Sequence, residues 1–187
     1  MLEGLDKTGK STQSRALHRI LDPASTVHVH MPSGLSTFTN KTYSMLESDV
    51  SAPTSGVAKQ LAHLACHAES VPQIGELLAT QAVVLDRWWW STCAYGWYSG
   101  DFPVAGVTEA AFRNLIDSIW FPITASVVFL FDKPYQADAN NADPILAGYH
   151  RLATEQQELT VRLPQGDTAH ITDLIVHALR ERNLFDH

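Results

Sequence analysis

The sequence predicts an α/β protein in which helices cover both faces of a parallel sheet. Short apolar runs rich in Val, Leu and Phe alternate with longer stretches of helical periodicity. Apolar runs separated by helices are typical of a parallel sheet that is buried on both faces. Strand, helix and strand follow one another along the chain, which is the order of a doubly wound sheet. Ligands of such sheets bind beyond the carboxyl ends of the strands.

Buried strands are expected at TVHVHM (26–31), AVVLD (82–86) and SVVFLF (126–131), with AHIT (169–172) as a weaker fourth. A further strand falls on Met1–Glu3, which is shorter than the typical length of about five or six residues. We expect this strand to be central in the sheet. Additional apolar residues ahead of Met1 are therefore expected to raise the melting temperature.

Six segments are expected to be helical, and Thr108 begins one of them as an N-cap with Glu109 in the first turn. The expected helices span residues 11–21, 36–47, 56–79, 108–120, 144–162 and 173–182. A chain of 187 residues suits one compact domain, so we expect a single domain over 1–187.

The composition restricts the possible classes of protein. With 45% hydrophobic and 18% charged residues, the chain resembles folded proteins rather than disordered ones. Without an apolar run of about 18 residues or a signal-peptide pattern, we expect no membrane association. We expect a cytoplasmic protein, in the host cytosol if the source is viral, with Cys66 and Cys93 as reduced thiols. The net charge of −7 argues against broad binding to nucleic acid.

The segment GLDKTGKS (4–11) matches the phosphate-loop motif G-x-x-x-x-G-K-[ST]. Gly4 and Gly9 let backbone N–H groups curl around a phosphate without interference from a Cβ. Lys10 supplies a cation to the outer phosphates, and Ser11 offers a hydroxyl to Mg²⁺. The helix that follows presents its positive dipole end to the anion. The motif predicts ATP and Mg²⁺ as cofactors and a three-layer P-loop NTPase fold.

The stretch VVLDRWWW ends an expected buried strand with an acidic and a basic residue. Asp86 is expected to join Ser11 at the metal site, and its alternative role is to cap the next turn. Arg87 is expected to face the same crevice and contact the oxygens of the transferring phosphate. The alternative is an ordinary surface arginine.

In EGLDKTGKSTQ and LDRWWWSTCAYG the chain resembles the thymidylate kinases, which are P-loop nucleoside monophosphate kinases. The resemblance implies ATP-dependent, Mg²⁺-assisted phosphorylation of a deoxynucleoside monophosphate to the diphosphate. The acceptor would be dTMP or a related or modified pyrimidine nucleotide. The resemblance also implies nucleotide substrates as partners and a homodimer, for which the helix 56–79 and Trp120 are candidate contacts.

The resemblance further implies the roles of individual residues. Lys7, Lys10 and Arg87 would be catalytic, and Ser11 and Asp86 would belong to the metal site. Asp6 would accept a hydrogen bond from the acceptor's sugar, beside which Tyr95 would pack. The expected ATP phosphate-binding residues are Gly4, Thr8, Gly9, Lys10, Ser11 and Thr12. The expected acceptor-binding residues are Asp6, Pro32, Lys41, Cys66, His67, Ser70, Arg87, Trp88 and Tyr95.

Several positions depart from the family pattern. Cys66 and Ser70 stand where the family has Phe and Arg for the base, and Leu35 stands near the position of an acceptor-phosphate Arg. The lid segment, about 132–144, is short and has no arginine. The candidate replacements are Lys41, His30 and His67, for which a solvated lysine and packed histidines are the alternatives. Trp88 or Trp89 is expected to face the crevice.

Two other functions stay open. One is a kinase for another hydroxyl, such as a hydroxymethylpyrimidine nucleoside or a modified DNA base in phage-type DNA modification. An alcohol acceptor needs no phosphate clamp, and a modified base is the only nucleic-acid substrate that we expect. The other is a non-catalytic, nucleotide-binding regulatory protein, against which Lys10, Ser11, Asp86 and Arg87 argue.

Overall fold

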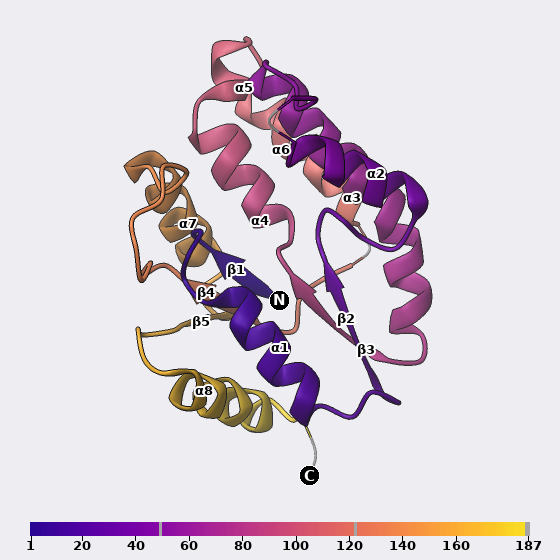
Figure 1. The fold of residues 1–187 in the computed structure, drawn as a ribbon, viewed down its shortest axis with the longest axis vertical. Helices are drawn as coiled ribbons and strands as arrows, with labels where there is room; N and C mark the ends of the chain where they lie inside the picture. Colours follow the sequence, from indigo (N-terminus) through magenta and orange to yellow (C-terminus); the bar gives the residue numbers. More distant parts are fainter. Residues whose placement is uncertain (49, 122, 186–187) are drawn as a thin grey trace.

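The computed structural model describes residues 1–48, 50–121 and 123–185. Within them lies a five-stranded parallel sheet with the spatial order β2-β3-β1-β4-β5. The central position of β1 confirms the expectation (Figure 1). The strands are β1 (Leu2–Gly4), β2 (Thr26–His30), β3 (Ala82–Asp86), β4 (Val128–Phe131) and β5 (Thr160–Arg162).

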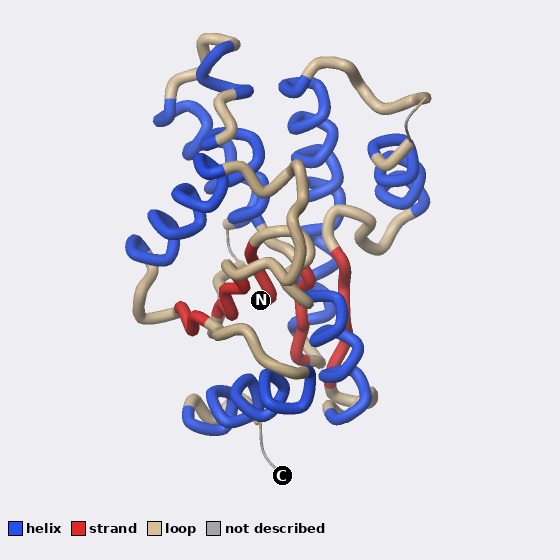
Figure 2. The backbone as a smooth tube through the Cα atoms, turned by 60° about the vertical axis from the view of Figure 1, so that its left-hand side comes forward, coloured by secondary structure: helices blue, strands red, loops and turns tan. Residues whose placement is uncertain are grey.

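Helices cover both faces of the sheet, which confirms the three-layer architecture (Figures 1 and 2). Side chains of β4 alternate between the two layers: Phe129 and Phe131 pack against one, Val128 and Leu130 against the other. The first layer holds α1 (Lys10–Ile20) and α8 (Thr168–Glu181). The second holds α3 (Gly56–Leu78), α4 (Trp89–Thr92), the π-helix η1 (Cys93–Tyr98), α6 (Glu109–Trp120) and α7 (Asp143–Glu155). Two further helices, α2 (Thr37–Leu46) and α5 (Asp101–Val104), pack on α3 and η1, respectively.

The C-terminal third of the chain differs from the expectation. The segment 169–172 is not a strand but lies in α8, because the side chain of Asp167 caps the helix by accepting a bond from the His170 N–H at 2.8 Å. The last strand is Thr160–Arg162, inside a segment that we expected to be helical. It pairs with Val128–Leu130, so a contact between distant segments selects the extended conformation there.

The strand β1 is as short as the sequence indicates. It pairs with β3 only at Leu2, whereas β2 pairs with β3 along all five residues. An apolar cavity of about 630 Å³, lined in part by Leu85 and Val127, adjoins Met1. The Met1 ammonium donates to the Val127 carbonyl at 2.8 Å, and burial lowers its pKa to about 5. Burial thus keeps this amine uncharged near neutral pH, and the proton that it loses on folding disfavours the folded state below pH 8.

The structure bears on two expectations drawn from the composition, which concern the cysteines and membrane-spanning segments. Cys66 and Cys93 are buried and form no disulfide. In the described ranges, no helix is both long enough and apolar enough to cross a membrane.

Candidate active site

The phosphate loop joins β1 to α1. Gly4 has a φ of 134°, and a Cβ there would lie 2.0 Å from the Phe131 carbonyl oxygen, so only glycine fits. Gly9 has a φ of 91° and caps α1, where its carbonyl accepts from the Gln13 N–H at 2.9 Å. Lys7 is exposed and adopts a left-handed φ of 57°. These conformations curl the backbone into the cradle that the motif predicts.

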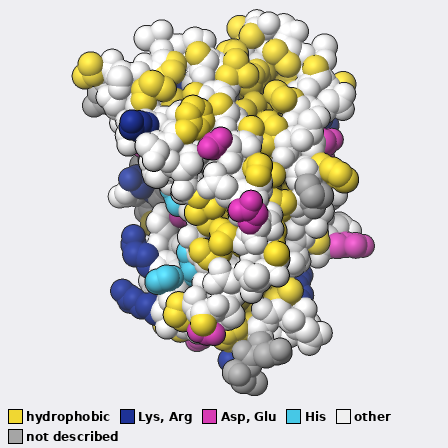
Figure 3. Space-filling model, turned by 90° about the vertical axis from the view of Figure 1, so that its right-hand side faces the viewer, with side chains coloured by type: hydrophobic (Ala, Val, Ile, Leu, Met, Phe, Trp, Pro, Cys, Tyr) yellow, Lys and Arg dark blue, Asp and Glu magenta, His cyan; other side chains and the backbone are white. Residues whose placement is uncertain are grey.

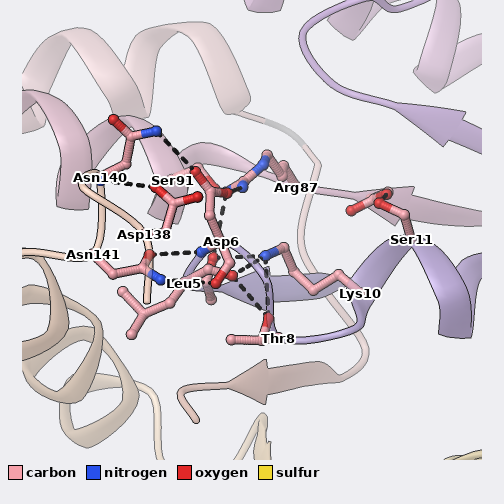
Figure 4. A network of polar contacts seen from close by, with 12 residues as sticks. Leu5, Asp6, Thr8, Lys10, Ser11, Arg87, Ser91, Asp138, Asn140 and Asn141 are labelled. Atoms are coloured by element: carbon pink, nitrogen blue, oxygen red, sulfur yellow. Dashed lines mark hydrogen bonds and ion pairs between the residues drawn. The ribbon is translucent and has the colours of Figure 1, made fainter. Parts of the chain in front are cut away.

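Lys10 is buried at the centre of this cradle (Figure 4). Its ammonium donates to the carbonyl oxygens of Gly4, at 3.0 Å, and Leu5, and to the Thr8 hydroxyl at 3.4 Å. Burial, together with the nearby charge of Arg87, lowers the pKa of Lys10 to about 7. An anion in the loop would offset this loss of solvation. Thr12 lies on the exposed side of α1.

Ser11 and Asp86 come together at the carboxyl end of the sheet. The Ser11 hydroxyl donates to Oδ2 of Asp86 at 3.4 Å, and Nδ1 of His30 lies 3.3 Å from the same oxygen. Burial by itself raises the pKa of Asp86, but the hydrogen bond from His30 and the charge of Arg87 outweigh it and lower the pKa overall. In the described ranges Oδ1 of Asp86 is buried without a hydrogen-bond partner. An ionised carboxylate with a free oxygen beside a hydroxyl suits Mg²⁺.

Arg87 lies between the phosphate loop and the acceptor side. Its guanidinium pairs with Asp6 and donates to the Gly4 carbonyl at 3.3 Å and the Ser91 hydroxyl at 3.0 Å (Figure 4). It also lies over the Tyr95 ring, 5.6 Å from the ring centre. Its φ of 73° is unusual for a residue other than glycine and turns the side chain back toward the loop. The structure therefore joins Asp6, Arg87 and Tyr95 in one cluster.

The side chain of Glu3, which our sequence analysis did not single out, stabilises the backbone that follows β3. It is fully buried in β1 and accepts bonds from the Trp88 N–H at 2.6 Å, the Ser91 N–H at 3.1 Å and the Ser91 hydroxyl at 2.7 Å. Burial raises the pKa of Glu3, against the hydrogen bonds, which lower it. The sequence does contain a signal for this role, because Glu3 is a carboxylate in an apolar strand directly before the phosphate-loop motif.

The short segment 132–144 lies against the phosphate loop. The Asn141 side chain accepts from the Asp6 N–H and donates to the Asp6 carbonyl, both at 2.8 Å (Figure 4). The Tyr135 N–H donates to the Lys7 carbonyl at 2.9 Å, and its hydroxyl donates to the Gly166 carbonyl at 2.6 Å. The bonds to Asp6 and Lys7 attach the segment to the phosphate loop, and the Tyr135 hydroxyl joins it to the turn before α8.

A cavity of about 470 Å³ opens beside Arg87. Its wall includes six of the residues that the sequence singled out for the acceptor side: Asp6, His30, Pro32, His67, Arg87 and Tyr95. Other polar residues of the wall were missed, although several stand one turn apart on the expected helix 56–79. They are Tyr43, Glu47, Lys59, Gln60, His63, Ser91, Thr92, Asp101 and Asn140.

Four expected acceptor-side residues lie elsewhere. Lys41 is on the exposed side of α2, and Cys66 is fully buried. Ser70 is also fully buried, because the backbone at Gly34 packs on it so closely that a Cβ there would lie 2.3 Å from the serine Oγ. Trp88 is in the core, with its ring centre 6.0 Å from that of Trp120.

Trp89 and Trp90 are buried as well, so the expectation that Trp88 or Trp89 faces the crevice is wrong. Their bulk fills the layer between the sheet and the helices α3 and α6. Trp120, which we considered for a dimer contact, is buried in the same core. Leu35 is partly exposed and is not part of the cavity wall.

Comparison with known proteins identifies the family to which the chain belongs. A sequence model described as thymidylate kinase matches residues 2–112, which is more than half of the chain. This chain belongs to the thymidylate kinase family. It is therefore a phosphotransferase of the nucleoside monophosphate kinase type. A search among curated proteins found no match.

The fold is similar to those of two solved thymidylate kinases. The crystal structure of the enzyme from Ehrlichia chaffeensis matches with a TM-score of 0.75 and 17% sequence identity, over 96% of each chain. The structure of the enzyme from Candida albicans matches with a TM-score of 0.67 and 19% identity, over 98% of this chain and 91% of that one. At these identities the likeness is one of fold.

Proposed function

We propose that the protein transfers the terminal phosphoryl group of ATP to a pyrimidine deoxynucleoside monophosphate, dTMP or a related or modified nucleotide, with Mg²⁺. The observation that supports this most is the position of the Asp6–Arg87 pair. It separates the phosphate cradle around Lys10 from the acceptor cavity, so one guanidinium faces both. Phosphoryl transfer needs donor and acceptor aligned on either side of the transferring group.

The residues present fit both cofactors. Lys10 and the backbone from Gly4 to Thr12, Thr8 included, would hold the ATP phosphates. Ser11 and the free oxygen of Asp86 would hold Mg²⁺. When bound, the metal ion neutralises charge on the phosphate oxygens. Lys7, exposed at the tip of the loop, would approach the transferring group from the solvent side.

The acceptor's phosphate would pair with individual cations inside the cavity, whose wall also carries the carboxylates of Asp6, Glu47 and Asp101. Lys59 and Arg87 both belong to its wall, and Lys59 provides the cation that Leu35 and Lys41 do not. Two cations support a monophosphate acceptor over an alcohol such as a hydroxymethylpyrimidine nucleoside or modified DNA base. Asp6 and Tyr95 would contact the sugar.

A substrate panel tests this proposal. ATP consumption would be measured with dTMP, dUMP, dCMP, dGMP, free nucleosides and DNA that carries hydroxymethylpyrimidines. We expect turnover with at least one pyrimidine monophosphate and none with nucleosides or DNA. Turnover confined to an alcohol acceptor would contradict the proposal and support the alternative. Binding of ATP without turnover on any acceptor would support a regulatory protein.

Three further expectations belong to the same proposal: a single domain over 1–187, a cytoplasmic location and a homodimer. Family resemblance supports the homodimer. So do exposed leucines on two helices that pack together, Leu61 on α3 and Leu115 on α6.

A further inference from the structure

His67 lies where α3 meets the acceptor cavity. Its side chain belongs to the cavity wall although only 3% of its surface is exposed. Nδ1 of its ring accepts a hydrogen bond from the indole Nε1–H of Trp120 at 3.2 Å. The two rings meet edge to face, with centres 5.4 Å apart and planes at 79°. Because an indole nitrogen only donates, Nδ1 of His67 carries no proton in this arrangement.

The proton of His67 is therefore on Nε2. Burial, with His63 nearby, lowers the pKa of His67 to about 3, so the ring is neutral over the physiological range. Among the described residues no hydrogen bond to Nε2 is found, and His67 belongs to the cavity wall. His67 thus adds to the cavity wall an N–H donor whose tautomer is fixed by the indole.

Trp120 is well placed to hold this arrangement. It is 3% exposed, and its ring also meets that of Trp88 edge to face. Packing against Trp88 keeps the indole in place, so its N–H stays directed at His67. Trp120 is not part of the cavity wall, so its influence on a bound acceptor passes through His67.

We propose that Trp120 is a positioning residue that holds His67 as an Nε2–H donor. This donor selects an acceptor base that presents a carbonyl oxygen, as thymine and uracil do, over one that presents an amino group, as cytosine does. The inference rests on the proposed function, in which this cavity holds the acceptor. It explains how the chain can recognise a base without the arginine that the family places on this helix.

The physical reason for selection is an unpaired donor. A carbonyl oxygen accepts the hydrogen bond of Nε2–H, whereas an amino group on the base would place two donors opposite each other. Sites that hydrogen-bond a substrate group discriminate strongly against analogues that cannot pair. We expect kcat/KM to be at least about 100-fold higher for dTMP or dUMP than for dCMP.

Nitrogen NMR tests the tautomer without any turnover. We expect Nε2 of His67 to be protonated and Nδ1 to be unprotonated from pH 5 to 8. Trp120→Phe removes the indole donor and should mix the two tautomers. A protonated Nδ1 in the unaltered protein, or a ring that becomes doubly protonated near pH 6, would overturn the proposal.

Kinetics tests the consequence for the base. Trp120→Phe should reduce the preference for dTMP over dCMP by about ten-fold or more, with the KM for ATP unchanged. Trp97→Phe is the matched control, because Trp97 stacks on Phe112 in the same layer and is not part of the cavity wall. Melting temperatures would show that both variants fold. An unchanged preference in a folded Trp120→Phe, or an equal loss in Trp97→Phe, would contradict the positioning role.

The unaltered enzyme separates this inference from the proposed function. Equal turnover of dTMP and dCMP would overturn base selection and leave the kinase proposal intact. Absence of turnover with every nucleoside monophosphate would overturn both. The His67→Gln variant keeps a side-chain N–H donor, so it should retain more of the preference than His67→Leu does.

Discussion

At the scale of single residues, the candidate site is a set of charges that hold one another in place. Arg87 is paired with Asp6 and tied to Ser91, which in turn bonds to the buried Glu3. Among the described residues Lys10 pairs with no carboxylate, and its ammonium donates to backbone carbonyls of its own loop. Its ammonium would therefore exchange these carbonyls for the oxygens of an incoming phosphate.

Replacing Lys10 tests this assignment. Lys10→Ala should lower kcat by at least about 100-fold, because the transferring charge loses its fixed cation. Initial rates with saturating ATP and acceptor would measure the effect. Lys41→Ala is a suitable control, since Lys41 is exposed on α2 and lies outside the cavity wall. Full activity of the Lys10→Ala protein would contradict phosphoryl transfer at this loop.

At the scale of elements, β1 combines the chemistry of the loop with a weakness in the sheet. Its carboxyl end carries the phosphate loop, while its amino end leaves an apolar cavity beside Met1. The buried ammonium there has a pKa of about 5 in the folded protein, against an ordinary value of 8.0. Between these values the unfolded chain binds the extra proton, so stability should rise with pH from about 5 to 8.

An extension of β1 tests both features. Four apolar residues added ahead of Met1 should raise the melting temperature by several degrees, because they fill the cavity and remove the buried amino group. Thermal unfolding at pH 5 to 8 should then show a smaller dependence on pH. A Gly-Ser extension of equal length removes the buried amino group without filling the cavity. If both extensions stabilise equally, strand completion is not the cause.

At the scale of the whole molecule, the side on which α2 and α3 lie carries many hydrophobic side chains (Figures 1 and 3). Phe38, Leu61, Leu78 and Leu115 are all exposed by more than a third. Apolar surface of this kind is typical of protein interfaces. A second copy of the chain, packed through α3 and α6, is the occupant that family resemblance supports.

The oligomeric state tests this interface. Analytical ultracentrifugation of the unaltered protein should show a dimer, and Leu115→Glu should shift it toward monomers, because the interface would bury an unpaired carboxylate. Val104→Glu is the control, since Val104 is 91% exposed on α5, outside the proposed interface. A monomer at micromolar concentration in the unaltered protein would contradict the proposal.

Local patterns in the sequence determined much of this protein. The spacing of Gly4, Gly9, Lys10 and Ser11 specifies the phosphate loop, and short apolar runs specify β2, β3 and β4. Both features depend on residue types within a few positions of one another, so they can be recognised in the sequence. Asp86 and Arg87 could be placed at the site because a parallel sheet brings its carboxyl ends together.

Only the tertiary structure decided the rest. Thr160–Arg162 is a strand because β4 lies beside it, and a helix forms at 168–181 where a strand was expected. His67 belongs to the cavity wall, whereas Cys66 and Ser70 do not. The β2–α2 loop and α2 pack on α3, and this packing determines which residues of α3 remain accessible from the cavity. Such contacts join residues far apart along the chain, and no local pattern specifies them.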